Sequence, residues 1–356
     1  MSNICDKTKC TGCMACYNAC PRHCISMVYD ENGILNPQIQ DNLCSGCNIC
    51  STVCPVNKDI PVTMPLETYA CWDLNNENRK TSSSGGIAFI FYEHFIQNDG
   101  IVYGCYYDEN LQLKFSKATT LEELGKFKTS KYSQAYIGNI FREIFSMLNN
   151  NKNILFIGTP CQIAGLKSYL RKDYDNLITI DLICHGVPSQ KFIDEYINSL
   201  NLNTFPDNLT FRGLNDFYFV LYKNTDIIYS KKARDDAYYS SFLNGLFYRE
   251  SCYTCKYACK ERISDITIGD FWGLGEKIPF NHDITNGVSV ALINTEKGNN
   301  FFNNIKDKIF FEKRTLQEAV EGNEQLRHPS IKNKNYEKFK KLYIDYGFEY
   351  ALKECL

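Results

Sequence analysis

The chain has 356 residues, 18 of them cysteine, with 39 Lys and Arg against 41 Asp and Glu, a formal net charge of −2 at pH 7. This balance argues against nucleic acid or an anionic membrane as a partner. The longest apolar run, at 86–91, is far shorter than the about 20 residues that cross a bilayer, and no charged-then-apolar leader precedes Cys10. We therefore expect a cytoplasmic protein of about two domains, without membrane insertion, whose cysteines are metal ligands or free thiols.

Eight cysteines in the first 54 residues form two copies of the motif C-x2-C-x2-C-x3-C-P at 10–21 and 44–55. This is the spacing of two-cluster bacterial ferredoxins, in which the fourth cysteine of each run binds the other cluster. Zinc sites use paired ligands, so the tripled spacing favours iron–sulfur clusters over zinc or a disulfide scaffold. We predict two 4Fe-4S clusters, one held by Cys10, Cys13, Cys16 and Cys54 and the other by Cys44, Cys47, Cys50 and Cys20.

The stretch between the two motifs predicts a small hairpin. ISMVYDENGILNPQI at 25–39 contains two short strands joined at Asn32-Gly33, a type I′ turn signal. Residues 1–60 therefore indicate an α+β ferredoxin-like two-cluster domain. The proline-rich PVNKDIPVTMP at 55–65 is extended, and we expect a semi-rigid linker over 61–80.

Residues 81–356 predict an α/β domain with a mixed, partly parallel sheet. NILFIG at 153–158 and NLITIDLIC at 176–184 are strands, each followed by a tight turn and a helix, the second helix capped by Ser189. Turns at the carboxyl ends of such strands line a common crevice. Further strands are expected in a hairpin that turns at 108–110 and in SDITIGDFWG and GVSVALINT. The last 45 or so residues are expected to be helical, and their aromatic stripe indicates packing rather than a cofactor site.

Five cysteines of this second domain are candidates for a third iron–sulfur site. Cys161 and Cys184 each follow a predicted strand, and Cys252, Cys255 and Cys259 lie in CYTCKYAC. Two of the ligands must meet through tertiary folding, and the alternative is that these are buried free cysteines. Five candidates for four places leave one spare.

A small, glycine-rich stretch precedes the first predicted helix of the second domain. TSSSGGIAFIF at 81–91 could bind a phosphate through backbone N–H groups at a helix N-terminus, or it could be a flexible linker capped by Ser84. Lys131 lies among hydroxyl residues and would complement a phosphate, although a single lysine is usually just solvated. No G-x-G-x-x-G follows a strand, so a standard Rossmann site is not indicated.

Other features are less specific. His185 could donate a proton or bind a flavin, or it could be structural, and Asp265 and Asp270 could face a ligand or form turns. No G-x-S-x-G or H-E-x-x-H motif supports hydrolase chemistry. The remaining cysteines have no partner spacing and are interpreted as structural or incidental: Cys5, Cys24, Cys71, Cys105 and Cys355.

Several of these motifs together resemble the coenzyme F-420 hydrogenase/dehydrogenase beta-subunit family over about residues 68–345. They are GTPCQIAGL, ICHGVPS, the SSGG loop, SKY, the C-x2-C before SDITIGDFWG, and LRHPS. The resemblance implies a bound FAD held with the help of Ser84, Gly85, Gly86, Ser130, Lys131, Gly158 and Thr159. It also implies a cluster near the flavin on Cys161, Cys184, Cys252 and Cys255. Cys259 falls where that family usually lacks cysteine.

Two functions remain for this chain. The first is an iron–sulfur flavoprotein oxidoreductase that passes electrons from a low-potential donor such as ferredoxin through 4Fe-4S clusters to FAD and on to a small-molecule two-electron acceptor. The alternative is an electron-transfer subunit that has no substrate of its own and docks on a catalytic partner. An open pocket at the flavin favours the first, and a large exposed apolar patch favours the second. Either function is compatible with an oligomer.

Overall fold

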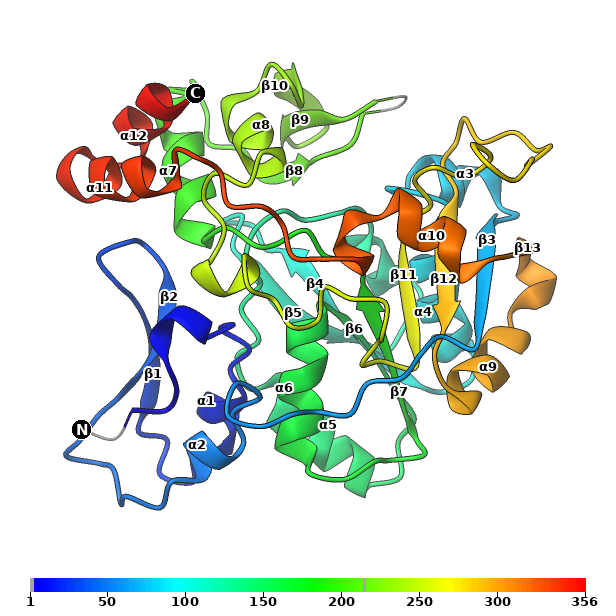
Figure 1. The fold of residues 1–356 in the computed structure, drawn as a ribbon, viewed down its shortest axis with the longest axis horizontal. Coiled ribbons are helices and arrows are strands. Elements are labelled where there is room, and N and C mark those ends of the chain that lie inside the picture. Colours follow the sequence, from blue (N-terminus) through cyan, green and yellow to red (C-terminus); the bar gives the residue numbers. More distant parts are fainter. Residues whose placement is uncertain (1–2, 214–215) are drawn as a thin grey trace.

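The largest element of the fold is an eight-stranded mixed sheet (Figure 1). The computed structural model describes residues 3–213 and 216–356. Strand order is β13-β3-β12-β11-β7-β6-β4-β5, and the contacts of β4 with β6, β6 with β7 and β7 with β11 are parallel. The strands are β3 (Glu67–Asp73), β4 (Ile101–Tyr107), β5 (Leu113–Ala118), β6 (Ile154–Gly158), β7 (Leu177–Leu182), β11 (Ile266–Asp270), β12 (Ser289–Ile293) and β13 (Ile309–Arg314). The predicted mixed, partly parallel sheet is confirmed.

Helices cover both faces of this sheet. On one face lie α5 (Ile140–Asn149) and α6 (Pro160–Leu170), and on the other α4 (Ile87–Gln97) and α9 (Glu296–Asn303). The two faces carry separate apolar clusters, and successive residues of β4 belong to different ones: Tyr103 packs with α5 and α6, whereas Val102 packs with α4 and α9. A third cluster, around α10 (Leu316–Gly322), covers β3 and β12. Strands buried on both faces are continuously apolar, which is why ILFIG of β6 is buried throughout.

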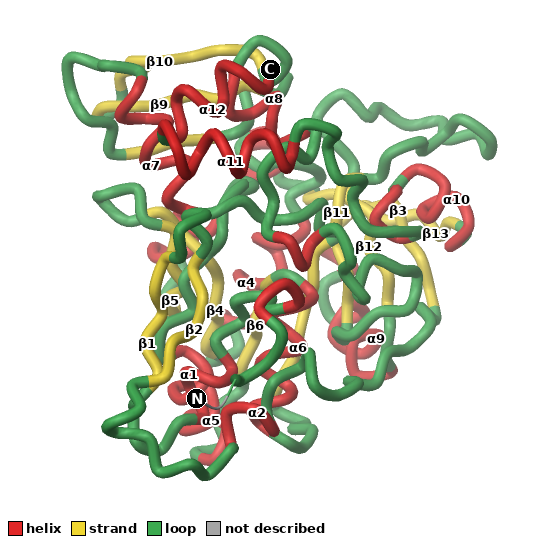
Figure 2. Tube along the Cα trace, turned by 60° about the vertical axis from the view of Figure 1, so that its left-hand side comes forward, coloured by secondary structure: helices red, strands yellow, loops and turns green. Residues whose placement is uncertain are grey.

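A third lobe packs beside the sheet, as Figure 2 shows. It consists of α7 (Gln190–Ser199), β8 (Asn208–Thr210), β9 (Tyr218–Lys223), β10 (Asp226–Lys232), α8 (Ala237–Leu243), α11 (Tyr336–Tyr346) and α12 (Phe348–Cys355). Its core is aromatic, with Phe192 in contact with Phe339, Tyr343 and Phe348. The aromatic stripe of the last helices is therefore packing surface, apart from Tyr346, which is 65% exposed.

The N-terminal module holds α1 (Ala15–Ala19), the antiparallel hairpin of β1 (Ile25–Tyr29) and β2 (Leu35–Ile39), and α2 (Ile49–Thr52). The hairpin is confirmed, but its predicted turn type is wrong. Gly33 donates its N–H to the Asp30 carbonyl (2.9 Å) and has a φ of 71°, whereas Asn32 is not left-handed. A type I′ turn needs positive φ at both central residues, so this is a type I turn followed by a bulged glycine.

The expected linker over 61–80 is wrong for most of its length. Residues 67–73 form β3, which pairs with β12 on one side and β13 on the other, and Asn76–Lys80 form α3. Thr63 is also part of the folded structure, because its N–H and C=O form hydrogen bonds of 2.8 Å with the backbone C=O and N–H of Arg262. The prolines end at residue 65, and Tyr69, Ala70 and Cys71 of β3 are buried next to strands from the far end of the chain.

The N-terminal module is docked on the second domain rather than tethered to it. Arg142 of α5 donates to the carbonyls of Tyr17 and Cys20, both at 3.0 Å, and so caps the end of α1. Ser168 of α6 donates to the Val53 carbonyl at 2.6 Å. Cys13, Met14, Ala15 and Val53 belong to the same apolar core as α5 and α6. The module therefore completes its small core with the helices of the second domain, as the contact of α1 with α6 in Figure 1 illustrates.

Candidate iron–sulfur and flavin sites

Four cysteines of the N-terminal module line one hollow beside α1. They are Cys10, Cys13, Cys16 and Cys54, here called the first N-terminal group. The loop can turn around this hollow because Gly12 and Met14 have φ of 67° and 60°. The structure thus brings the last cysteine of the second motif to the first three of the first motif, as the predicted crossed ligation requires.

Four other cysteines line a second hollow in the same way. Cys44, Cys47, Cys50 and Cys20 form this second N-terminal group. Gly46 and Asn48, with φ of 72° and 57°, take the places of Gly12 and Met14. Cys47 is exposed, whereas the cysteines of the first group are all buried. The second group therefore lies at the surface and the first lies inward.

Each hollow contains a fifth cysteine that the spacing did not indicate. Cys24 lies in the second hollow with its Sγ 3.3 Å from that of Cys20. Cys5 lies in the first hollow, where its hydrogen bond lowers the pKa of Cys10 to about 5 and that of Cys54 to about 7. Neither belongs to the repeated motif, so only tertiary proximity reveals them.

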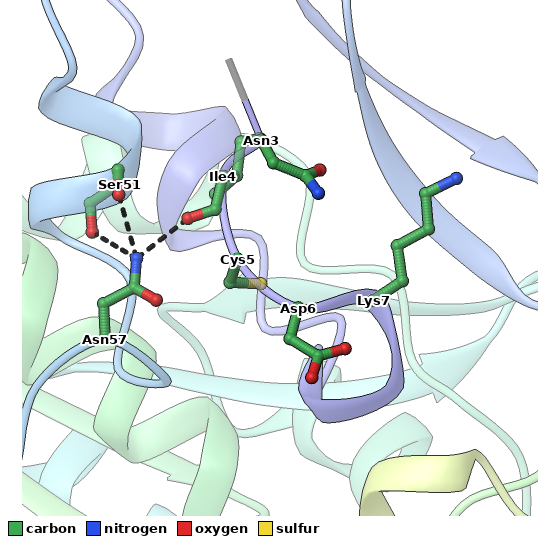
Figure 3. Close-up of a pocket in the computed structure, with 7 residues that line it drawn as sticks. All are labelled: Asn3, Ile4, Cys5, Asp6, Lys7, Ser51 and Asn57. Carbon is green, nitrogen blue, oxygen red and sulfur yellow. Dashed lines mark hydrogen bonds between the residues drawn. The ribbon is translucent and has the colours of Figure 1, made fainter. Parts of the chain in front are cut away.

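The segment that carries Cys5 is held by Asn57 (Figure 3). The Asn57 Nδ2 donates to the Ile4 carbonyl at 2.8 Å and to the Ser51 carbonyl and hydroxyl at 3.0 and 2.9 Å. Because Ser51 lies in α2, this amide fixes the N-terminal segment to the helix that precedes Cys54.

The four cysteines predicted for a third site converge at the carboxyl ends of β6 and β7. This second-domain group is Cys161, Cys184, Cys252 and Cys255. Burial raises the pKa of Cys184 well above its usual value, and the three other thiols of the group raise it further. Burial likewise raises the pKa of Cys161 to about 12, with the thiols of Cys255 and Cys252 adding to the increase. The structure therefore brings four half-buried, mutually close thiols together from three separate segments.

Cys259 stands apart from the second-domain group. Its thiol donates to the carbonyls of Lys256 and Glu261, at 3.6 and 3.3 Å. The loop around it is held by Arg262, which donates to the carbonyls of Tyr257 and Cys259 at 3.1 and 3.0 Å. Arg262 also pairs with Asp181 at 3.0 Å, and both side chains are at most 2% exposed. A buried ion pair thus fixes the C-x2-C loop against β7.

The first N-terminal group and the second-domain group meet across α6. A Cβ on Gly165 would lie 2.9 Å from the Cβ and 3.0 Å from the Sγ of Cys13, so α1 and α6 touch there without an intervening side chain. Cys161 lies four residues earlier, at the start of the same helix, which corresponds to about one turn or about 6 Å along the axis.

The two N-terminal groups have the ligand chemistry of a 4Fe-4S cluster. Among residues 3–213 and 216–356, no three His, Cys, Asp or Glu side chains lie close enough to hold one metal ion. A 4Fe-4S cluster instead takes four thiolates around a larger body, one at each iron. Four cysteines around a hollow, with no carboxylate or histidine among them, match that requirement in each N-terminal group.

The SSGG and SKY loops, which were expected to hold a flavin, lie next to each other. The Ser130 N–H donates to the Ser83 hydroxyl at 2.6 Å, which joins the SKY and SSGG loops. Gly86 caps α4 with a φ of 83° and provides no side-chain cap. Gly85 packs tightly, since a Cβ there would lie 2.4 Å from the Cys71 carbonyl. Backbone N–H groups at the start of α4 remain available for an anion.

Two expected flavin residues make other contacts. The Lys131 ammonium donates to the carbonyls of Phe127, Lys128 and Thr129 at 3.3, 2.7 and 2.9 Å, and burial lowers its pKa. Thr159 forms a capping box with Gln162, and its hydroxyl lies 3.2 Å from the Cys161 Sγ. Gly158 ends β6 beside this cap. Lys131 thus stabilises its own loop, and Thr159 contacts the second-domain group directly.

A cavity of about 410 Å³ opens beside the SSGG loop. Its lining includes Arg79, Ser82, Ser83, Arg212, Asp270 and Trp272. Arg212 pairs with Asp270 at 3.0 Å. Burial lowers the pKa of His185, and the nearby Asp270 carboxylate partly offsets this decrease. Asp265, by contrast, accepts hydrogen bonds from Thr179 and Thr295, whereas Asp270 lines this cavity.

The described part of the chain has no helix that is both long and apolar enough to cross a membrane. Its architecture is that of a two-cluster ferredoxin module joined to an α/β domain. Residues 9–58 match the family model of the 4Fe-4S dicluster domain, and residues 151–319 match that of the C terminus of the coenzyme F420 hydrogenase/dehydrogenase beta subunit. These two matches agree with the resemblance that the motifs of the sequence indicated.

Known relatives agree with this classification. The F subunit of the F(420)H(2) dehydrogenase of Methanosarcina mazei is 22% identical over 317 residues, 84% of this chain and 83% of that protein. The PorD subunit of the pyruvate synthase of Methanocaldococcus jannaschii is 46% identical over 54 residues, 15% of this chain and 58% of that protein. A chain of the F420-reducing [NiFe] hydrogenase complex from Methanosarcina barkeri has the same fold, with a TM-score of 0.50 at 16% identity over 82% of this chain and 92% of that chain.

Proposed function

We propose that this chain is an iron–sulfur flavoprotein oxidoreductase in which the three cysteine groups each hold a 4Fe-4S cluster and form one route to FAD. The contact between Cys13 and Gly165 carries the proposal, because it joins the first N-terminal group to α6, whose first turn contains Cys161. When bound, the clusters supply single-electron transfer and the flavin pairs two electrons for a hydride acceptor. The rigid docking of the N-terminal module keeps the groups at a fixed separation.

Electrons are proposed to arrive at the second N-terminal group. Its Cys47 is exposed, and Leu43, which precedes Cys44 in the chain, is 43% exposed. A low-potential protein such as ferredoxin could dock there, because exposed apolar side chains favour transient contact. The buried first group then lies between this surface and the second-domain group.

The flavin is proposed to lie at the edge where the SSGG and SKY loops meet, beside the cavity of about 410 Å³. The role of Ser84, Gly85 and Gly86 is to present the N-terminus of α4 to a phosphate. Ser130 and Lys131 hold the neighbouring loop in place. Thr159, next to Gly158, connects this edge to Cys161.

Iron analysis of the anaerobically purified protein tests the cluster count. We expect about twelve irons per chain for three clusters. Cys161→Ser should lose about four of them, whereas the matched variant Cys259→Ser should lose none, because Cys259 lies outside the group. About eight irons in the wild type, unchanged by Cys161→Ser, would mean that these cysteines are only packing residues.

Flavin released by denaturation tests the flavin site. Replacement of Gly86 by Val should abolish flavin binding, because its φ of 83° disfavours a branched side chain at the start of α4. Gly125→Val is the control, since a Cβ there meets nothing within 4 Å. Wild-type protein that retains its clusters but neither contains nor takes up FAD would refute the flavin assignment.

The second candidate is an electron-transfer subunit without its own substrate. It is favoured by the relatives, which are named as a dehydrogenase subunit and as part of a hydrogenase complex. Rapid mixing of the reduced protein with small acceptors, beginning with the F420 named for those relatives, separates the two candidates. Reoxidation by such an acceptor supports the oxidoreductase. Reoxidation only by a co-purified protein partner supports the electron-transfer role.

A further inference from the structure

Tyr257 has a buried hydroxyl with no protein partner. Its side chain is 6% exposed and packs in the same core as Cys13, with Cys161 and Cys255 at the margin of that core. Within the described residues no group hydrogen-bonds its hydroxyl. Native proteins rarely bury a hydroxyl unpaired, because its hydration is lost without replacement. The unpaired phenol therefore points to an acceptor that is not a protein group.

The surroundings of this hydroxyl are thiols from two groups. Burial raises the pKa of Tyr257, and four thiols raise it further: Cys161, Cys13, Cys255 and Cys54. Two of them belong to the second-domain group and two to the first N-terminal group. The phenol thus lies between the two groups, close to the contact of α1 with α6.

The position of Tyr257 is fixed by its backbone. Its carbonyl accepts a hydrogen bond from Arg262 at 3.1 Å, and Arg262 is itself held by the buried pair with Asp181. The backbone at Tyr257 is thus held in place, and the surrounding core encloses its ring. Tyr103 offers a comparison, because its hydroxyl is also buried but the group beside it is the Glu143 carboxylate rather than a thiol.

We propose that the Tyr257 hydroxyl donates a hydrogen bond to a cluster sulfur at the junction of the first N-terminal group and the second-domain group, and so raises the reduction potential of that cluster. Hydrogen bonds to cluster sulfurs stabilise the more negative, reduced state. Tyr257 is therefore a positioning residue that biases electron flow between the two groups. The inference rests on the proposed function, since it requires a cluster on the second-domain group.

Potentiometric titration followed by electron paramagnetic resonance tests the proposal in the full-length, cluster-loaded protein. Tyr257→Phe removes only the hydroxyl. We expect the midpoint potential of one of the two clusters to fall while iron content and flavin content stay unchanged. Tyr103→Phe is the matched control and should move neither potential. Unchanged potentials in Tyr257→Phe, with about twelve irons present, overturn the proposal and leave the proposed function intact.

A second measurement covers the case in which Tyr257→Phe loses a cluster. Electron–nuclear double resonance of the reduced wild-type protein, prepared in H₂O and in D₂O, should show an exchangeable proton coupled to the cluster whose sulfur accepts the hydrogen bond. The absence of such a proton overturns the proposal whatever the variant does. A wild-type content of about eight irons overturns it together with the proposed function, so the two failures are distinguished by the iron count.

Discussion

Arg249 joins the two domains at a buried point, and its removal should be strongly destabilising. The guanidinium belongs to a residue that is 2% exposed. It donates to the carbonyls of Cys10 and Leu35 at 2.6 and 2.8 Å. It also donates to the side-chain oxygens of Gln134 and Asn36 at 3.0 and 2.5 Å. All four acceptors are neutral, so the thiolates of the first N-terminal group provide the nearest proposed counter-charge.

The loss of unfolding free energy in Arg249→Met can be worked out from the oxygen acceptors that would lose their hydrogen-bond donor. The Cys10 carbonyl keeps a second donor, the Ser251 hydroxyl at 2.9 Å, so three acceptors lose their donor. Each buried unpaired acceptor costs about 1–3 kcal/mol. Because water and side-chain relaxation recover part of this, we expect a loss of about 3–5 kcal/mol, the range typical of breaking a buried charged network.

Anaerobic urea unfolding checks this magnitude. With a slope of about 3 kcal/mol per M, the midpoint should fall by about 1–1.7 M. Arg234→Met is the control, because the Arg234 side chain is 80% exposed and forms an exposed ion pair with Asp235 at 3.7 Å. The reasoning is refuted if Arg249→Met unfolds within about 0.3 M of the wild type with an unchanged slope.

Three further predictions concern the cysteine groups. Cys20→Ser should abolish the resonance of the second N-terminal group and Cys54→Ser that of the first, and loss of the same signal in Cys20→Ser and Cys13→Ser would disprove crossed ligation. Gly165→Ala should perturb the first group, because the new Cβ lies 3.0 Å from the Cys13 Sγ, and an unchanged resonance and unchanged electron-transfer rate would contradict it. The last prediction concerns the apo-protein after iron removal. Burial raises the pKa of the Cys161 thiol to about 12, so the folded apo-protein binds the thiol proton more tightly than the unfolded chain does. That stability is present below about pH 8.5 and is lost as the pH rises toward 12, so the urea midpoint of the apo-protein should fall with rising pH, and less so in Cys161→Ser.

The sequence alone determines the cysteine motifs and the local secondary structure of this protein, because both depend on residues close together in the chain. The two cysteine motifs, the strand-turn-helix units that contain β6 and β7, and the Ser189 cap of α7, whose hydroxyl accepts from the Lys191 N–H, are all visible as patterns. Each requires only neighbours a few residues apart, so the covalent chain itself fixes their geometry. The resemblance of the motifs to a known family extends this to the class of protein.

Only the tertiary structure decides which distant residues meet. β3 lies between β12 and β13, so its burial depends on residues more than 200 positions away, and local composition suggested a linker instead. The convergence of the second-domain group, the fifth cysteine in each hollow, and the positions of Arg249 and Tyr257 likewise depend on how the N-terminal module docks on α6. Long-range contacts are selected by packing and charge across the whole fold, and a short sequence window carries no record of them.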